Sequence, residues 1–269
     1  MRAAARDVVL ALPLAWLALT GSARGAEIIP DLYAATVFVT GQGEETRGPG
    51  LAKALAAVLV KVSGDPRLAA AAEVAGLTVK VADFVEAFSY RDRMAGIPVH
   101  DEQGSRDRPY DLTVTFEPAA IDAALQSLGS APWTAPRPEL LVVVAVLIGD
   151  TRFALAADGA KGRDMREAMV AAAEQYGMPV MLPTEALLQD AGSLDSGMLW
   201  MLARDSGADV AMSGTLTWSD TDLGWDAEWQ VTVDSVPYGW QAHRISFDNA
   251  FRSAIGGAAQ TLSGHGAPH

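Results

Sequence analysis

Histidine is the side chain best suited to acid–base or metal chemistry, because imidazole ionises near neutral pH and binds transition metals. The chain contains His100, His243, His265 and His269. No two of them have the spacing of a His-x-x-x-His ligand pair, so the sequence predicts no zinc site. We expect His243 to be a surface residue of a late strand. Cysteine is absent, which excludes disulfides, thiolate nucleophiles and cysteine-based metal sites.

Carboxylates around one turn form a second candidate site. They are Asp220, Asp222, Asp226 and Glu228. An EF-hand calcium loop needs Asp or Asn at its fifth position and Gly at its sixth. Those positions hold Gly224 and Trp225 here, so the pattern fails and we interpret the cluster as a solvated hairpin tip.

The glycine-rich stretch 41–50 resembles a phosphate-binding loop only superficially. It lacks the Lys-Ser/Thr pair of such loops, and Glu44 and Glu45 would repel phosphate. Ser63, followed closely by Asp65, could be imagined as a nucleophile. A helix C-terminus disfavours developing negative charge, so we interpret this segment as a helix stop. The sequence therefore predicts no catalytic residue, no metal site and no cofactor.

Four tryptophans fall within 23 residues and are the candidates for an interaction surface. They are Trp218, Trp225, Trp229 and Trp240. One interpretation places them in the core under a closing helix. The other places a subset on the surface, where tryptophan is a frequent hot spot for binding protein or glycan.

Hydrophobic periodicity predicts a first β-α-β-β-α module over residues 26–129. Helical spacing of apolar residues follows Pro49, which we place at the first helical position, and Gly64 is a suitable stop. Strands are predicted at 32–39, 85–90 and 110–116, and a second helix runs from Pro118 to Gly129. Residues 130–138 contain three prolines, which predicts a stiff linker between two domains.

Residues 139–263 predict a second, α/β domain. Leu140–Ile148 is apolar at every position, as in a strand covered on both faces. Helices are expected at 163–176 and 193–204, with strands at 178–182 and 208–218, which gives a β-α-β-α-β core. An antiparallel meander follows, with turns at 222–224 and 237–239, and then a closing helix at 250–262. We expect residues 264–269 to be disordered. The predicted fold class is α/β, with an α+β first module.

The first 25 residues have the layout of a secretory signal peptide. Arg2 and Arg6 precede the apolar run 8–20, and cleavage is expected after Gly25 or Ala23. No later segment approaches transmembrane length. The chain has 20 Lys+Arg against 33 Asp+Glu and a net charge of −13, so nucleic acid is a poor partner.

Several segments resemble an uncharacterised proteobacterial family of exported proteins, catalogued as a domain of unknown function. These segments include Leu32–Val39, Lys61–Asp65, Phe88–Tyr90, Arg137–Val144, Gly177–Pro183 and Gly207–Gly214. The second half, through Gly207–Asp209, a strand and Gly214, also resembles the small α/β domain of the Tol–Pal translocation protein and related envelope lipoproteins. The resemblance implies a periplasmic location and an adaptor role, and it brings no catalytic residues.

Three functions remain open from the sequence. The first is a non-enzymatic interaction or adaptor protein of the cell envelope, binding an unidentified envelope or periplasmic protein. The second is a periplasmic protein that binds a small ligand or glycan, with its site between the domains. The third is a carboxylate-dependent hydrolase.

Overall fold

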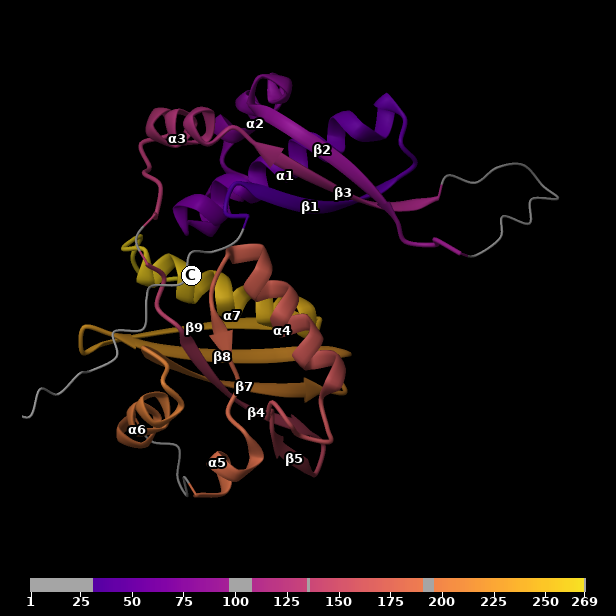
Figure 1. Cartoon of the computed structure of the whole chain (residues 1–269). Helices are drawn as coiled ribbons and strands as arrows, with labels where there is room; N and C mark the ends of the chain where they lie inside the picture. Colours follow the sequence, from indigo (N-terminus) through magenta and orange to yellow (C-terminus); the bar gives the residue numbers. More distant parts are fainter. Residues whose placement is uncertain (1–30, 97–107, 135, 191–195, 269) are drawn as a thin grey trace, which may run out of the picture.

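The chain builds two structural units, each around its own sheet. The computed structural model describes residues 31–96, 108–134, 136–190 and 196–268, so the predicted export signal lies outside the described residues. The first sheet has the strand order β1-β3-β2, and the second has the order β5-β4-β7-β8-β9, with β6 also pairing with β4. Helices pack on both sheets (Figure 1), which confirms the predicted α/β class.

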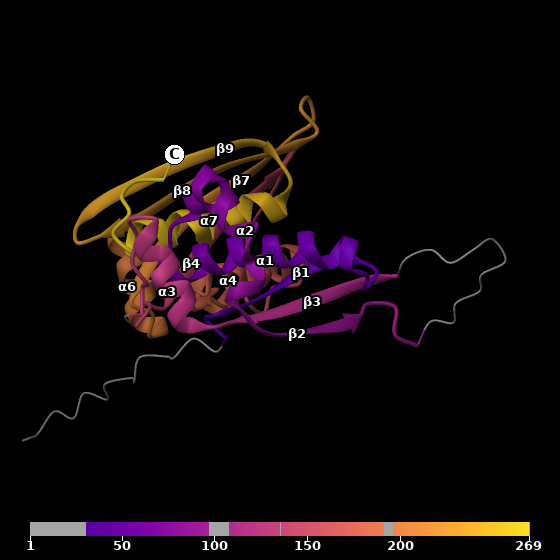
Figure 2. The same ribbon diagram turned by 90° about the horizontal axis from the view of Figure 1, so that it is seen from above.

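The first unit is an antiparallel sheet with helices on one face. Helix α1 lies along that face (Figure 2), and Leu55, Val58 and Leu59 on it are fully buried. In β3 the residues Leu112, Val114 and Phe116 alternate into the same core, as predicted. The elements are β1 (Ala34–Thr40), α1 (Glu44–Ser63), α2 (Ala72–Thr78), β2 (Val85–Asp92), β3 (Pro109–Phe116) and α3 (Pro118–Ser127).

The start of α1 corrects the sequence prediction. The helix begins at Glu44, and Pro49 lies inside it rather than at its first position. Two glutamates in the first turn favour an earlier start, because they interact well with the positive end of the helix dipole. Gly50 lets the helix approach the sheet, since a Cβ there would lie 2.8 Å from both Leu112 and Val39. The end is as predicted, with Gly64 in the left-handed conformation at φ 76°.

The second unit combines parallel and antiparallel pairing. Strand β4 runs parallel to β6 and β7, while β7, β8 and β9 form the predicted antiparallel meander. Strand β5 and helix α5 were not predicted, since four and six residues are too few to show a clear period. The strands are β4 (Leu140–Ile148), β5 (Thr151–Ala154), β6 (Val180–Met181), β7 (Val210–Ser219), β8 (Gly224–Val233) and β9 (Val236–Ile245).

The two faces of the second sheet are covered unequally. Helices α4 (Arg163–Tyr176) and α7 (Phe247–Leu262) pack on one face and bury the larger core. Helices α5 (Glu185–Asp190) and α6 (Ser196–Ser206) pack on the other face, over parts of β4 and β7. Figure 1 shows α4 and α7 between the second sheet and the first unit. The remainder of the opposite face carries no helix among the described residues.

Two predictions at the C-terminal end are wrong. The turn expected at 237–239 lies inside β9, and the chain reverses at Asp234 and Ser235, whose φ values are 49° and 67°. Pairing of β8 with β9 outweighs the local turn signal, and an edge strand tolerates Pro237. The tail is also ordered as far as it is described: Gln260 Nε2 donates to the Ala267 carbonyl at 2.9 Å.

Two described residues of the proline-rich segment 130–138, Trp133 and Arg137, contact both units. The Trp133 N–H donates to the Val62 carbonyl at 2.8 Å. The guanidinium of Arg137, a residue only 4% exposed, donates to carbonyls at the C-terminal ends of two helices. These acceptors are Lys61 and Val62 of α1, and Tyr176 and Gly177 at the end of α4.

The buried charge of Arg137 has no need of a carboxylate in this setting. Each helix C-terminus carries roughly half a negative charge, so two of them together balance one cation. Burial lowers the pKa of Arg137 to about 10, which leaves the guanidinium charged at neutral pH. The expected linker therefore contacts both units, and Arg137 and Trp133 lie at the interface between them.

Candidate functional site

Three of the four candidate tryptophans are core residues. Trp225, Trp229 and Trp240 are 7%, 3% and 6% exposed, and Trp218 is half-buried beside Trp225. Alternation along β8 turns Trp225 and Trp229 toward α7, and register places Trp240 opposite Trp229. These three residues therefore lie in the core under the closing helix, as the first of the two interpretations predicted. Their indoles do not form an exposed patch.

Among the residues that the structure describes, the exposed tryptophan is Trp200, which was not among the candidates predicted from the sequence. It is 63% exposed on α6, and the guanidinium of Arg204 lies 5.3 Å from its ring centre. Leu202 and Ala203 form the buried face of this helix. Trp200 lies outside the row of apolar residues that recur at helical spacing along α6. An apolar residue outside that row is expected on the exposed face of the helix, and this signal could have identified Trp200 from the sequence.

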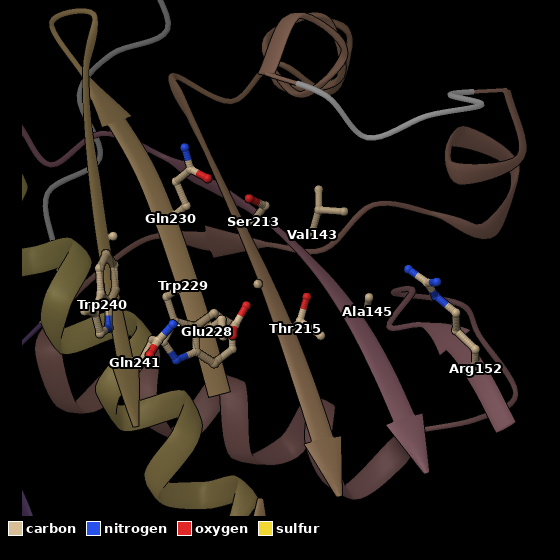
Figure 3. A pocket seen from close by; sticks show the side chains of 12 residues that line it. Val143, Ala145, Arg152, Ser213, Thr215, Glu228, Trp229, Gln230, Trp240 and Gln241 are labelled. Carbon is tan, nitrogen blue, oxygen red and sulfur yellow. Dashed lines mark hydrogen bonds between the residues drawn. The ribbon is translucent and has the colours of Figure 1, made fainter. Parts of the chain in front are cut away.

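The partly uncovered face of the second sheet contains a hollow, which we call the open-face groove. Its volume is about 460 Å³. Figure 3 shows its side chains arranged across neighbouring strands, from β5 to β9. Its lining includes Ala145, Arg152, Ser213, Thr215, Glu228 and Gln230.

Strand register explains why this face is hollow. Thr215 pairs with Ala145 on one side and with Glu228 on the other, so the three residues form one row across β4, β7 and β8. Small side chains therefore occupy the middle of the row. Glu228 on β8 ends this row with a longer side chain. Arg152 on β5 pairs with Leu147, two residues further along β4, and its side chain extends toward Ala145 (Figure 3). The groove is a shallow trough lined by both polar and apolar residues.

The two borders carry opposite charges. Arg152 is exposed, and the described residues give its guanidinium no ion-pair or hydrogen-bond partner. Glu228 is also exposed, and its Oε1 accepts a long bond of 3.4 Å from Gln241 Nε2. Hydroxyl groups of Ser213 and Thr215 lie between them. The groove can therefore offer a cation, an anion and neutral hydrogen-bonding groups to one ligand.

The carboxylate cluster near the groove is distributed around a hairpin. Asp226 Oδ1 lies 3.1 Å from His243 Nδ1, and both side chains are exposed on the strands β8 and β9. Asp220 accepts from the Trp218 indole at 2.8 Å, and Asp222 accepts from the Ser219 hydroxyl at 3.0 Å. Within the part of the chain that the structure describes, no three His, Asp or Glu side chains are placed to hold a metal ion.

Ser63 lies in the helix stop that the sequence predicted. Its buried hydroxyl donates to the Leu59 carbonyl at 2.7 Å and accepts from the Asp65 N–H at 3.1 Å. The Asp65 carboxylate pairs with Arg67 at 2.8 Å. Burial acts to raise the pKa of Asp65, but hydrogen bonds and charge from Arg67, with a smaller effect of His265, lower it overall.

One region of the chain matches a known protein family. Residues 26–134 match the model of a family described as a domain of unknown function (DUF8605). The match contains the first sheet, its helices and Trp133, and it ends before Arg137 and the groove. No curated protein matches the chain. In the described ranges, no helix is both long and apolar enough to cross a membrane.

Proposed function

We propose that the protein is exported to the periplasm and acts there as a non-enzymatic binding protein of the cell envelope. The open-face groove is its binding surface. The pattern of residues 1–25 supports export, and the resemblance to exported envelope proteins supports the location. The observation that carries the binding role is the unequal cover of the second sheet, which leaves a concave face with charged and hydroxyl side chains open beside α5 and α6.

A protein partner is the first candidate for the ligand. Helix α6 lies on the same side of the sheet as the groove, and it carries Trp200 and Arg204 on its outer surface. Tryptophan and arginine are the residues most enriched among binding hot spots. An adaptor would bring both the groove and this helix against its partner.

A small polar ligand or glycan is the second candidate, and the size of the groove favours it. A volume of about 460 Å³ lies within the range of roughly 300–1,000 Å³ that is usual for small-molecule sites. For this candidate we propose the open face of the second sheet as the site, in place of the interface between the units that the sequence suggested. Such a ligand would bind through hydroxyl, amide and charged groups, because Trp229 and Trp240 are turned into the core.

Site-specific photocrosslinking in intact cells tests the binding role. A photoreactive residue at Gln230, which is exposed in the groove, should give discrete adducts. The matched control is Val170, which is 57% exposed on α4 and therefore lies on the opposite side of the sheet. Equal labelling from Gln230 and Val170, or labelling from neither, would contradict a binding role for the groove.

The mass of the protein recovered from the envelope fraction tests export. Cleavage after Gly25 or Ala23 predicts an N-terminus at Ala26 or Arg24. The processed form should be released by osmotic shock with other periplasmic proteins. Recovery of an unprocessed chain in the cytoplasmic fraction would overturn this part of the proposal.

A further inference from the structure

The open-face groove has a charge pattern that fits the end of a polypeptide chain. Resting on the binding role proposed above, we infer that the groove binds the C-terminal segment of a partner protein. The terminal carboxylate contacts Arg152, and a Lys or Arg near the fourth residue from the end contacts Glu228. The segment lies across the strands, over Ala145 and Thr215.

Arg152 provides the carboxylate site. Its guanidinium has no partner among the described residues, and Figure 3 shows it extending from β5 over the sheet toward Ala145. A guanidinium presents two parallel N–H donors that match the two oxygens of a carboxylate. A chain terminus is a carboxylate that every protein possesses, and it is free of the crowding around a side chain.

The spacing of the strands sets the length of the segment. Strands β5 and β8 are separated by β4 and β7, so three spacings of about 4.8 Å give roughly 14 Å between them. An extended chain advances about 3.5 Å per residue, so about four residues cover this distance. Glu228 then stands beside the fourth residue from the end, where a cationic side chain would meet its carboxylate.

The floor of the groove suits an extended backbone. The Ser213 and Thr215 hydroxyls can donate to peptide carbonyls and accept from peptide N–H groups. Ala145 lacks a bulky side chain, which lets the segment approach the sheet. The trough is open to solvent, whereas sites for free small ligands bury about 70–90% of the ligand. An open trough therefore favours the end of a longer chain over a free small peptide.

Binding to immobilised peptide pools tests the inference on the full-length exported protein. The probe is a pool of hexapeptides with biotin on the N-terminus, a free C-terminal carboxylate, Lys fixed at the fourth position from the end, and the other positions randomised. We expect binding to this pool, and at least about a tenfold loss when the terminus is amidated or the fixed Lys is replaced by Glu. Arg152→Gln and Glu228→Gln should each give a similar loss.

Matched controls come from an exposed pair on α4, on the other side of the sheet. Arg163 and Glu167 are 81% and 64% exposed and pair at 3.0 Å. Arg163→Gln and Glu167→Gln remove the same charges and should leave peptide binding unchanged. Circular dichroism of each variant verifies that the fold is retained.

Three results would overturn the inference. The first is equal binding of the amidated and free-acid pools, and the second is no binding of the pool by the wild-type protein. The third is full retention of peptide binding by both Arg152→Gln and Glu228→Gln, which would show that these two side chains do not contact the segment. If crosslinking from Gln230 still captures a partner after any of these results, the binding role of the groove stands without the C-terminal segment.

Discussion

The guanidinium carbon of Arg137 lies 4.4 Å from the centre of the Trp133 indole ring. A cation over an indole is a favourable contact, and more so where water is excluded. The same guanidinium donates to the ends of α1 and α4, so this pair joins the first unit to the second. The relative position of the two units therefore depends on a residue of the segment that connects them.

Replacement of Arg137 tests this role. For Arg137→Met we expect the free energy of unfolding to fall by about 3–5 kcal/mol, because buried carbonyls at two helix ends lose their charged donor. Urea denaturation followed by circular dichroism measures the change. The control Arg152→Met alters an exposed arginine and should shift stability by less than about 0.5 kcal/mol. If the two variants are equally stable, the joining role assigned to Arg137 is wrong.

The pH dependence of Asp65 has a definite sign. Its pKa is lowered in the folded state from the ordinary value of 3.8, so its contribution to stability is complete above 3.8 and is lost as pH falls through the lower folded pKa. Asp65→Asn should lower the free energy of unfolding by about 1 kcal/mol at pH 7. The difference from the wild type should shrink below pH 3.8 as the wild-type carboxylate becomes protonated.

Urea denaturation at several pH values, from 7 down to the acid limit of folding, measures this difference. Asp205→Asn is the control, because Asp205 is an exposed carboxylate that also pairs with an arginine. Asp205→Asn should change the free energy of unfolding very little at any pH. A gap between Asp65→Asn and the wild type that is constant across the acid range would show that the charge of Asp65 is unimportant.

The contrast between Trp229 and Trp200 tests which tryptophan is structural. Trp229→Ala removes a large buried side chain and should cost about 3–5 kcal/mol in the free energy of unfolding. Trp200→Ala changes a side chain that is 63% exposed and should cost less than about 1 kcal/mol. Thermal and urea unfolding measure both. A larger cost at Trp200 than at Trp229 would reverse the assignment.

Two glycines should respond oppositely to alanine. A Cβ on Gly214 would collide with the Trp229 ring, so Gly214→Ala should lower the free energy of unfolding by about 1–3 kcal/mol. Gly76 in α2 has no atom within 4 Å of such a Cβ, so Gly76→Ala should raise it by about 0.5–1 kcal/mol through helix propensity. Differential scanning calorimetry compares them, and destabilisation by both variants would contradict the packing described around Gly76.

The sequence by itself determined the elements that have a strong local period. The alternation in Tyr110–Phe116, the unbroken apolar run Leu140–Ile148 and the helix 163–176 with Gly177 after it are present as predicted. These patterns are local, because a side chain's direction follows from its neighbours along the same element. The start of α1, strand β5 and the last turn carry weaker or conflicting local signals, and there the prediction was incomplete or wrong.

Tertiary structure alone decided where the surfaces lie. The groove joins Ala145, Arg152, Thr215 and Glu228 from four strands, and their meeting depends on strand order and register. Arg137 appears from sequence to be part of a proline-rich spacer, yet it reaches two helix ends that are 76 and 39 residues away along the chain. The sequence contains a cluster of tryptophans, but whether each side chain is exposed depends on which face of the sheet the helices cover. A local pattern shows which residues share a face of a strand or helix. Only long-range strand pairing and packing determine what covers that face.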